Sequence, residues 1–223
     1  MNTATDTRSL VGPKVCLMGL GGTGKTYALG TLVDWAALND FEVAVLFTEN
    51  GLETLLGYFR DHGKESPPNL FWHQQTTKPI SLKALMATAD SVGKLSYEAL
   101  AKSIDSNRGG ENNAFWKILQ SCSDFIDDRT GKSLGPIDAF GAKRIFVMDS
   151  LTETANAAMK MQIGSRPMAS PGDYGVAQNN LMNFLRLCTQ GMECPFVMTA
   201  HVDRELDGVT QATKIMIKAI GKA

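Results

Sequence analysis

The sequence lacks the features of a membrane-spanning, secreted or strongly charged protein. None of its apolar runs approaches the roughly 20 residues that a transmembrane helix needs, and residues 1–10 are polar, without the apolar core of a signal peptide. Lysine and arginine total 22 against 23 acidic residues, so the net charge of −1 gives no general attraction to nucleic acid or to an anionic membrane. We expect no membrane partner, and DNA binding would need a local basic patch.

Cysteine and histidine are also few. The four cysteines form no C-x-x-C pair, and His62, His73 and His201 have no metal-ligand spacing, which argues against a disulfide framework and a transition-metal site. We therefore expect a reduced, cytoplasmic protein. With 223 residues, 43% of them hydrophobic and 20% charged, the chain has ordinary globular composition, so we expect one domain at 14–223 after a disordered tail at 1–13.

One segment indicates the class of ligand. Residues 19–26 read GLGGTGKT, a complete G-x-x-x-x-G-K-[ST] phosphate-binding loop (P-loop). Its glycines allow successive N–H groups to turn inward around a polyphosphate, and the first turn of the following helix directs its positive dipole end at the anion. Lys25 brings a charge to the β- and γ-phosphates, and Thr26 offers a hydroxyl to Mg2+. The residues predicted to bind the nucleotide are Gly19, Gly21, Gly22, Thr23, Gly24, Lys25, Thr26 and Tyr27.

The apolar pattern predicts an alternating α/β chain around this loop. Strands are predicted at 14–18, 43–48, 70–75, 144–149, 195–200 and 213–218. Helical spacing is found at 27–38, 81–103, 115–126, 151–161 and 177–188, with loops at 61–68, 128–141 and 162–172. This alternation is typical of a mainly parallel sheet flanked by helices.

A second signal is the apolar strand that ends in Asp149. The carboxyl ends of parallel strands share the edge at which open α/β sheets bind ligands, and in P-loop enzymes such a carboxylate helps to hold Mg2+. The sequence therefore predicts a metal site at Thr26 and Asp149. Glu49 and His201 follow two other predicted strands, and Ser150 is predicted to cap the next helix.

The chain resembles one P-loop family more than others. A guanine-recognition motif of the Asn-Lys-x-Asp type is absent, and Arg166 and Arg204 are too isolated for the arginine-rich lid of a small-molecule kinase. The phrases FVMDSLT at 146–152 and VMTAH at 197–201 resemble the phage AAA-type nucleotide-binding family, from about Val15 to the C-terminus. That family has a RecA-like ATPase fold, and some members are regarded as single-strand annealing proteins of the Sak group.

The resemblance implies a three-layer RecA-like P-loop NTPase fold and roles for three residues. Glu49 corresponds to the catalytic base, Lys25 to the phosphate-binding lysine, and His201 to the residue that reads the γ-phosphate, although RecA itself has glutamine there. A RecA-like sheet also has a strand that flanks the P-loop strand on its outer side. If 213–218 forms that strand, the domain is minimal; if it does not, the chain is a fragment.

The resemblance further implies a homo-oligomer and contact with single-stranded DNA. RecA-like ATPases complete their site with a cation from a neighbouring subunit, for which Arg204, Lys214 and Lys218 are available, although solvated surface charge explains each of them as well. The loops at 162–172 and 203–212 occupy places that contact DNA in RecA relatives, but the second is acidic. Three aromatic residues could stack on bases or belong to the core: Trp72, Trp116 and Tyr174.

These observations predict a Mg2+-dependent RecA-like ATPase that converts ATP to ADP and phosphate. The resemblance adds that it is phage-encoded, works in the cytoplasm of the infected host, and acts in DNA recombination or single-strand annealing. Two alternatives stay open: a nucleotide-switched assembly or loader module without DNA binding, and a P-loop phosphotransferase with a small acceptor. The preference for adenine over guanine rests only on the absent motif and the resemblance.

Overall fold

The computed structural model describes residues 12–75, 82, 83, 86, 90, 113–164, 169–206 and 213–220. The predicted helix at 81–103 lies outside this part, apart from four residues that are helical. The predicted tail, 1–13, also lies outside it, apart from Gly12 and Pro13. The Gly12 N–H donates to the Glu193 carbonyl at 2.9 Å, and the Pro13 carbonyl accepts from the Phe196 N–H at 2.9 Å.

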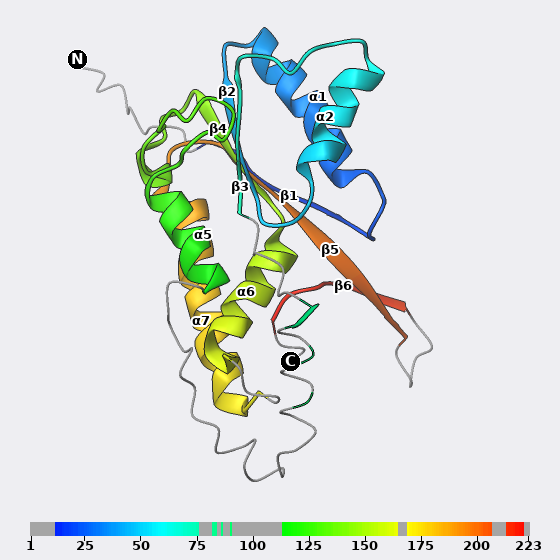
Figure 1. Ribbon diagram of the computed structural model, residues 1–223, viewed down its shortest axis with the longest axis vertical. Coiled ribbons are helices and arrows are strands. Elements are labelled where there is room, and N and C mark those ends of the chain that lie inside the picture. Colours follow the sequence, from blue (N-terminus) through cyan, green and yellow to red (C-terminus); the bar gives the residue numbers. More distant parts are fainter. Residues whose placement is uncertain are drawn as a thin grey trace, which may run out of the picture.

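The centre of the molecule is a mainly parallel sheet (Figure 1). Its strands are β1 (Lys14–Gly19), β2 (Glu42–Phe47), β3 (Leu70–Gln74), β4 (Arg144–Asp149), β5 (Phe196–Leu206) and β6 (Thr213–Ile217). The order is β1-β5-β4-β2-β3, all parallel, while β6 pairs with β5 in the antiparallel direction. All six strands were predicted, and the α/β fold with a mainly parallel sheet flanked by helices is confirmed.

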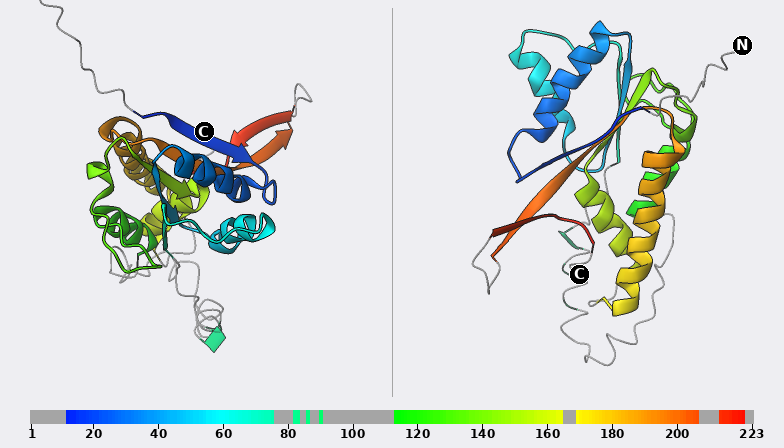
Figure 2. Two further views of the ribbon diagram at one scale, coloured as in Figure 1. Left: turned by 90° about the horizontal axis from the view of Figure 1, so that it is seen from above. Right: turned by 180° about the vertical axis from the view of Figure 1, so that it is seen from behind.

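Helices cover both faces of this sheet. They are α1 (Lys25–Leu38), α2 (Leu52–Asp61), α5 (Ala114–Ser123), α6 (Leu151–Ile163) and α7 (Pro171–Arg186), with a 3-10 turn η1 (Ile137–Ala139) and a π-helical turn η2 (Leu187–Gly191). Helices α1 and α2 lie on one face, and α5, α6 and α7 lie on the other (Figures 1 and 2). The result is a three-layer domain with a separate apolar core on each face.

The two cores explain why the central strands are apolar at nearly every position. The β4 residues Phe146 and Met148 belong to the core under α5, α6 and α7, whereas Ile145 and Val147 belong to the core under α1 and α2. Because successive side chains of a strand point to opposite faces, a strand covered on both sides must be apolar throughout. Polar residues at the end of such a strand therefore lie at the edge of the sheet, where ligands bind.

Two helix predictions differ from the structure. Helix α2 was not predicted, although Leu55, Tyr58 and Phe59 in its sequence are buried against the sheet. The helical repeat predicted to continue to Phe125 and Ile126 is wrong, because α5 ends at Ser123 and both residues belong to the following loop. Phe125 is still buried, and its N–H donates to the Gly135 carbonyl at 2.9 Å, so apolar spacing alone could not distinguish this loop residue from a helical one.

The C-terminal part of the sheet also differs. His201 was predicted to end its strand, but β5 continues to Leu206 because residues 202–206 pair with β6. The predicted loop at 203–212 therefore begins within a strand. The strand predicted at 213–218 is confirmed as β6, but it extends the far end of β5 instead of flanking the P-loop strand (Figure 1). Among the described strands, β1 pairs with β5 alone.

Candidate functional site

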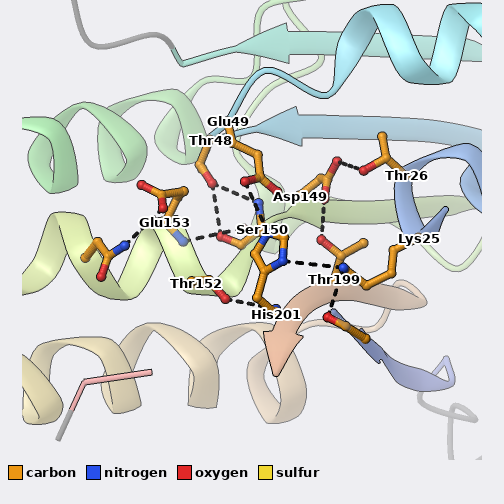
Figure 3. A network of polar contacts seen from close by, with 12 residues as sticks. Lys25, Thr26, Thr48, Glu49, Asp149, Ser150, Thr152, Glu153, Thr199 and His201 are labelled. Atoms are coloured by element: carbon orange, nitrogen blue, oxygen red, sulfur yellow. Dashed lines mark hydrogen bonds and ion pairs between the residues drawn. The ribbon is translucent and has the colours of Figure 1, made fainter. Parts of the chain in front are cut away.

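The carboxyl ends of β1, β2 and β4 and the middle of β5 bring Lys25, Thr26, Glu49, Asp149 and His201 together (Figure 3). In the pairing register, Gly19 of β1 lies opposite His201 of β5, and Phe47 of β2 lies opposite Asp149 of β4. His201 is thus the last β5 residue paired with the P-loop strand, even though β5 itself continues. The site is assembled from four separate segments of the chain, and Thr26 and Asp149, for example, are 123 residues apart in the sequence.

The P-loop has the backbone shape that its glycines permit. Gly22 and Gly24 have φ angles of 74° and 81°, in the left-handed region, and a Cβ at either position would meet no atom within 4 Å. Backbone conformation, not lack of space, therefore selects glycine at these two positions. Gly24 caps α1 without any side-chain hydrogen bond to the helix. The first N–H groups of α1 are consequently free of a competing side-chain cap, as an anion site at a helix N-terminus requires.

Lys25 is folded back onto the loop that precedes it. Its Nζ donates to the carbonyl oxygens of Gly19 at 3.0 Å and Leu20 at 2.8 Å, and lies 3.5 Å from Nδ1 of His201. The ammonium group is thereby held at the mouth of the P-loop by uncharged acceptors. An approaching phosphate would offer it a stronger, charge-assisted hydrogen bond in their place.

Asp149 is a buried carboxylate with a hydrogen bond to each oxygen. Its side chain has no solvent exposure; Oδ2 accepts from the Thr26 hydroxyl at 2.8 Å, and Oδ1 accepts from the Thr199 hydroxyl. Burial raises the pKa of Asp149 above its ordinary value, and the nearby charge of Glu49 raises it further. The hydrogen bonds from Thr199 and Thr26 and the charge of Lys25 act in the opposite direction.

The residues around Asp149 fit a magnesium ion. Carboxylate and hydroxyl oxygens are the hard ligands that Mg2+ accepts in phosphate-binding sites, where it usually keeps several waters. Gly51 leaves room beside them, because a Cβ there would lie 2.6 Å from Asp149 Oδ2. In the part of the chain that the structure describes, no group of three or more histidine, cysteine, aspartate or glutamate side chains could hold a metal. A cation at this position would be coordinated by oxygens of Thr26, Asp149 and the bound phosphates.

Glu49 and His201 form a polar pair beside this carboxylate. Oε2 of Glu49 lies 3.4 Å from Nε2 of His201, and both side chains remain partly open to solvent, at 29% and 27%. His201 therefore bridges Glu49 and the ammonium group of Lys25. Its backbone N–H donates to the Thr152 hydroxyl at 3.0 Å, which fixes this point of β5 against the start of α6.

Threonine side chains also hold together the strand ends near Asp149 and Glu49. The Thr48 hydroxyl donates to the Ser150 carbonyl at 3.0 Å and accepts from the Ser150 N–H at 2.9 Å, so it joins the ends of β2 and β4. The predicted cap is confirmed, since the Ser150 side chain accepts from the Glu153 N–H. Sequence reasoning missed Thr48, Thr152 and Thr199, because threonine is common in strands and at helix starts, and no spacing motif marks these three positions.

Other predicted residues lie apart from this cluster. The Tyr27 hydroxyl donates to Asp61 at 3.2 Å, and its ring packs against Tyr58 with centroids 5.2 Å apart, so this side chain is directed toward α2. The Trp72 ring lies under the guanidinium of Arg129. Arg204 is exposed on β5 opposite Ile215 of β6, and Trp116 and Tyr174 are exposed on α5 and α7.

Comparisons with known proteins show only distant structural similarity. No protein-family model and no curated protein matches the sequence. Among solved structures, the chain is similar to the assembled ATPase EscN from the type III secretion system of enteropathogenic E. coli. In complex with its central stalk EscO, that ATPase matches with a TM-score of 0.40 and 15% identity, over 91% of this chain and 45% of that one. A second EscN structure matches with a TM-score of 0.39 and 17% identity, over 90% and 39%.

This chain therefore spans less than half the length of the EscN chains to which it is similar. At this level of similarity, no residue role, substrate or partner is transferred from them. A separate finding concerns membranes: none of the described helices combines the length and the apolar character needed to cross a bilayer.

Proposed function

We propose that this domain binds Mg-ATP at the P-loop edge of its sheet and hydrolyses it to ADP and phosphate. The observation that carries the proposal is the hydrogen bond of 2.8 Å between the Thr26 hydroxyl and Asp149 Oδ2. It joins the last residue of the P-loop motif to the acid at the end of β4, from positions 123 residues apart. A P-loop NTPase needs this pair of oxygens side by side, because both serve the same metal ion.

The remaining residues fit the positioning and charge stabilisation that phosphoryl transfer requires. The P-loop N–H groups and Lys25 would bind the phosphates, and Thr26 and Asp149 would hold Mg2+, which supplies positive charge to the phosphate oxygens. Glu49 lies near Asp149, two residues after the end of β2, and is partly solvent-accessible, so it can orient a water and accept its proton. His201 contacts both Lys25 and Glu49, so a change in the contacts of Lys25 on phosphate binding would alter the surroundings of the proposed base, Glu49.

Phosphate release from Mg-ATP tests this proposal. Wild-type protein should release phosphate, whereas Glu49→Gln should bind ATP and release almost none. Glu53→Gln is the matched control. Glu53 is an exposed carboxylate in the first turn of α2, so its substitution should leave turnover unchanged. Normal turnover in Glu49→Gln would contradict the assigned base, and ATP consumption only with an added acceptor would favour a phosphotransferase.

A role in recombination or annealing of single-stranded DNA is the finer part of the proposal. This role rests on the sequence resemblance to the phage family. The same resemblance is the basis for proposing a cytoplasmic location and a homo-oligomeric state. The exposed rings of Trp116 and Tyr174, 54% and 43% accessible, are available for stacking on bases. Turnover that rises with single-stranded DNA would support this role, and turnover indifferent to DNA would favour the nucleotide-switched loader or assembly module.

A further inference from the structure

Thr199 occupies a position that no sequence motif marks. It lies on β5, between the P-loop strand and the strand that ends in Asp149, and its side chain has no solvent exposure. Val197, two residues earlier on the same strand, belongs to the core under α1 and α2. Because side chains alternate along a strand, Thr199 points to the same face, where its hydroxyl donates to Asp149 Oδ1.

The hydrogen bonds of Asp149 divide its two oxygens between two threonines. Oδ1 accepts from the Thr199 hydroxyl, and Oδ2 accepts from the Thr26 hydroxyl (Figure 3). A carboxylate bound at one oxygen only could rotate about its last side-chain bond. Bound at both oxygens, it is fixed in one orientation, with Oδ2 facing the first turn of α1.

This orientation has a consequence for Thr26. A threonine hydroxyl has one proton and two lone pairs. Since Thr26 gives its proton to Asp149 Oδ2, the lone pairs of its oxygen point away from that carboxylate and stay available to a cation. If Asp149 rotated, Thr26 would lose its acceptor, and its hydroxyl would no longer be held in this orientation.

We propose that Thr199 is a positioning residue for the magnesium site: its hydroxyl fixes Asp149 so that Asp149 and Thr26 present their oxygens to one cation. Thr199 does not touch the nucleotide in this account and acts through Asp149. The inference rests on the proposed function, because it assumes that the P-loop edge binds Mg-ATP.

Thr154 supplies a matched control for the test. It is a second buried threonine close to Asp149 in the sequence, and its hydroxyl donates to the Ser150 carbonyl at 2.9 Å within α6. Removing this hydroxyl changes the core to a similar extent but leaves both oxygens of Asp149 with their partners. Thr154→Val therefore reports the effect of losing a buried hydroxyl that does not bind the carboxylate.

The experiment measures binding of a fluorescent ATP analogue as Mg2+ is titrated, and again in EDTA, for wild type, Thr199→Val, Thr199→Ser and Thr154→Val. Thr199→Val should raise the Mg2+ concentration at half-saturation by about tenfold, the effect of losing one hydrogen bond to a charged group. Its affinity in EDTA should stay that of wild type. Thr199→Ser, which restores the hydroxyl, and Thr154→Val should both resemble wild type with Mg2+.

The outcomes separate this inference from the proposed function. If wild type fails to bind the analogue, or binds it equally with and without Mg2+, the proposed function fails. If wild type shows Mg2+-dependent binding and Thr199→Val matches it, or Thr154→Val shifts as much as Thr199→Val, the positioning role alone is overturned. Thermal unfolding of each variant checks its fold, and Thr199→Ala replaces Thr199→Val if the valine variant does not fold.

Discussion

The two sides of the candidate site are built differently. The P-loop side is open: Gly22 and Gly24 have free space around them, and Lys25 Nζ donates to two backbone carbonyls and lies 3.5 Å from His201. The acidic side is closed: Asp149 and Ser150 are fully buried, and hydroxyls of Thr26, Thr48 and Thr199 bind them. Ligand binding should therefore depend on the open side, whereas folding stability should depend mainly on the closed side.

The largest effect is expected from the open side. Lys25→Ala should reduce ATP affinity and turnover by about a hundredfold or more, because a charged group aimed at the phosphates is lost. The melting temperature without nucleotide should change little, since Lys25 is not a core residue and its partners are partly exposed carbonyls. Titration calorimetry and thermal unfolding measure both quantities. A large loss of stability in this variant would show that the open side is also needed for folding.

Gly51 tests how tightly the closed side is packed. A Cβ at this position would lie 2.6 Å from Asp149 Oδ2 and 2.8 Å from the Phe47 ring, so Gly51→Ala should cost about 1–3 kcal/mol in the free energy of unfolding. It should also weaken the Mg2+ dependence of ATP binding, since it displaces Asp149. The matched control is Gly57→Ala in α2, where the nearest atom would be 3.7 Å away.

The same chemical unfolding experiment applies to both glycine variants. Gly57→Ala should stabilise the protein by about 0.5–1 kcal/mol, because alanine loses less backbone entropy than glycine in a helix. Equal changes in the two variants would show that the space beside Asp149 is not restrictive.

Thr48 tests the hydrogen bonds that join β2 to β4. Thr48→Val would leave the buried Ser150 N–H without the acceptor it now has, at a cost of about 1–3 kcal/mol. Thr54→Val, at an exposed position in α2, should change the free energy of unfolding by less than about 0.5 kcal/mol. Denaturant unfolding measures both variants. An unchanged free energy of unfolding in Thr48→Val would contradict a structural role for the hydrogen bonds between Thr48 and Ser150.

The smallest expected effect concerns the charge of Asp149. Because its pKa in the folded protein is raised above the ordinary value of 3.8, the folded state holds this proton more tightly than the unfolded chain. Stability from this group is therefore lost as the pH rises from that value through the folded pKa. The asparagine of Asp149→Asn does not titrate. The melting temperature of this variant should therefore rise relative to that of wild type as the pH is raised from acidic to neutral. Its Mg-ATP turnover should be lost. Parallel pH curves would contradict the raised pKa.

The open side of the site was largely predictable from the sequence. Eight consecutive residues form the P-loop, so its motif carries both the residue types and their spacing. Asp149 was singled out as a candidate metal ligand because an apolar strand that ends in an acid is a recognisable pattern in a chain with a P-loop. The strands were predicted for a related reason: those buried on both faces are continuous apolar runs, which local sequence displays directly.

Apart from Asp149 and the Ser150 cap, the closed side was not predictable, because its contacts join residues far apart in the chain. Thr199 meets Asp149 only after β5 inserts between β1 and β4, and Thr48 meets Ser150 across 102 positions. The strand end at His201 was wrong for the same reason: only pairing with β6 shows that β5 continues. The residues next to a single threonine or histidine in the sequence do not indicate which distant residue it will contact.

The central claim is that this edge of the sheet is a magnesium-dependent ATP site, and calorimetric titration of wild-type protein with ATP tests it most directly. We expect saturable binding of one ATP per chain that is clearly tighter in Mg2+ than in EDTA. Absence of binding heat in both conditions, or equal affinity with and without Mg2+, would contradict the assignment of Thr26 and Asp149 to a shared metal site.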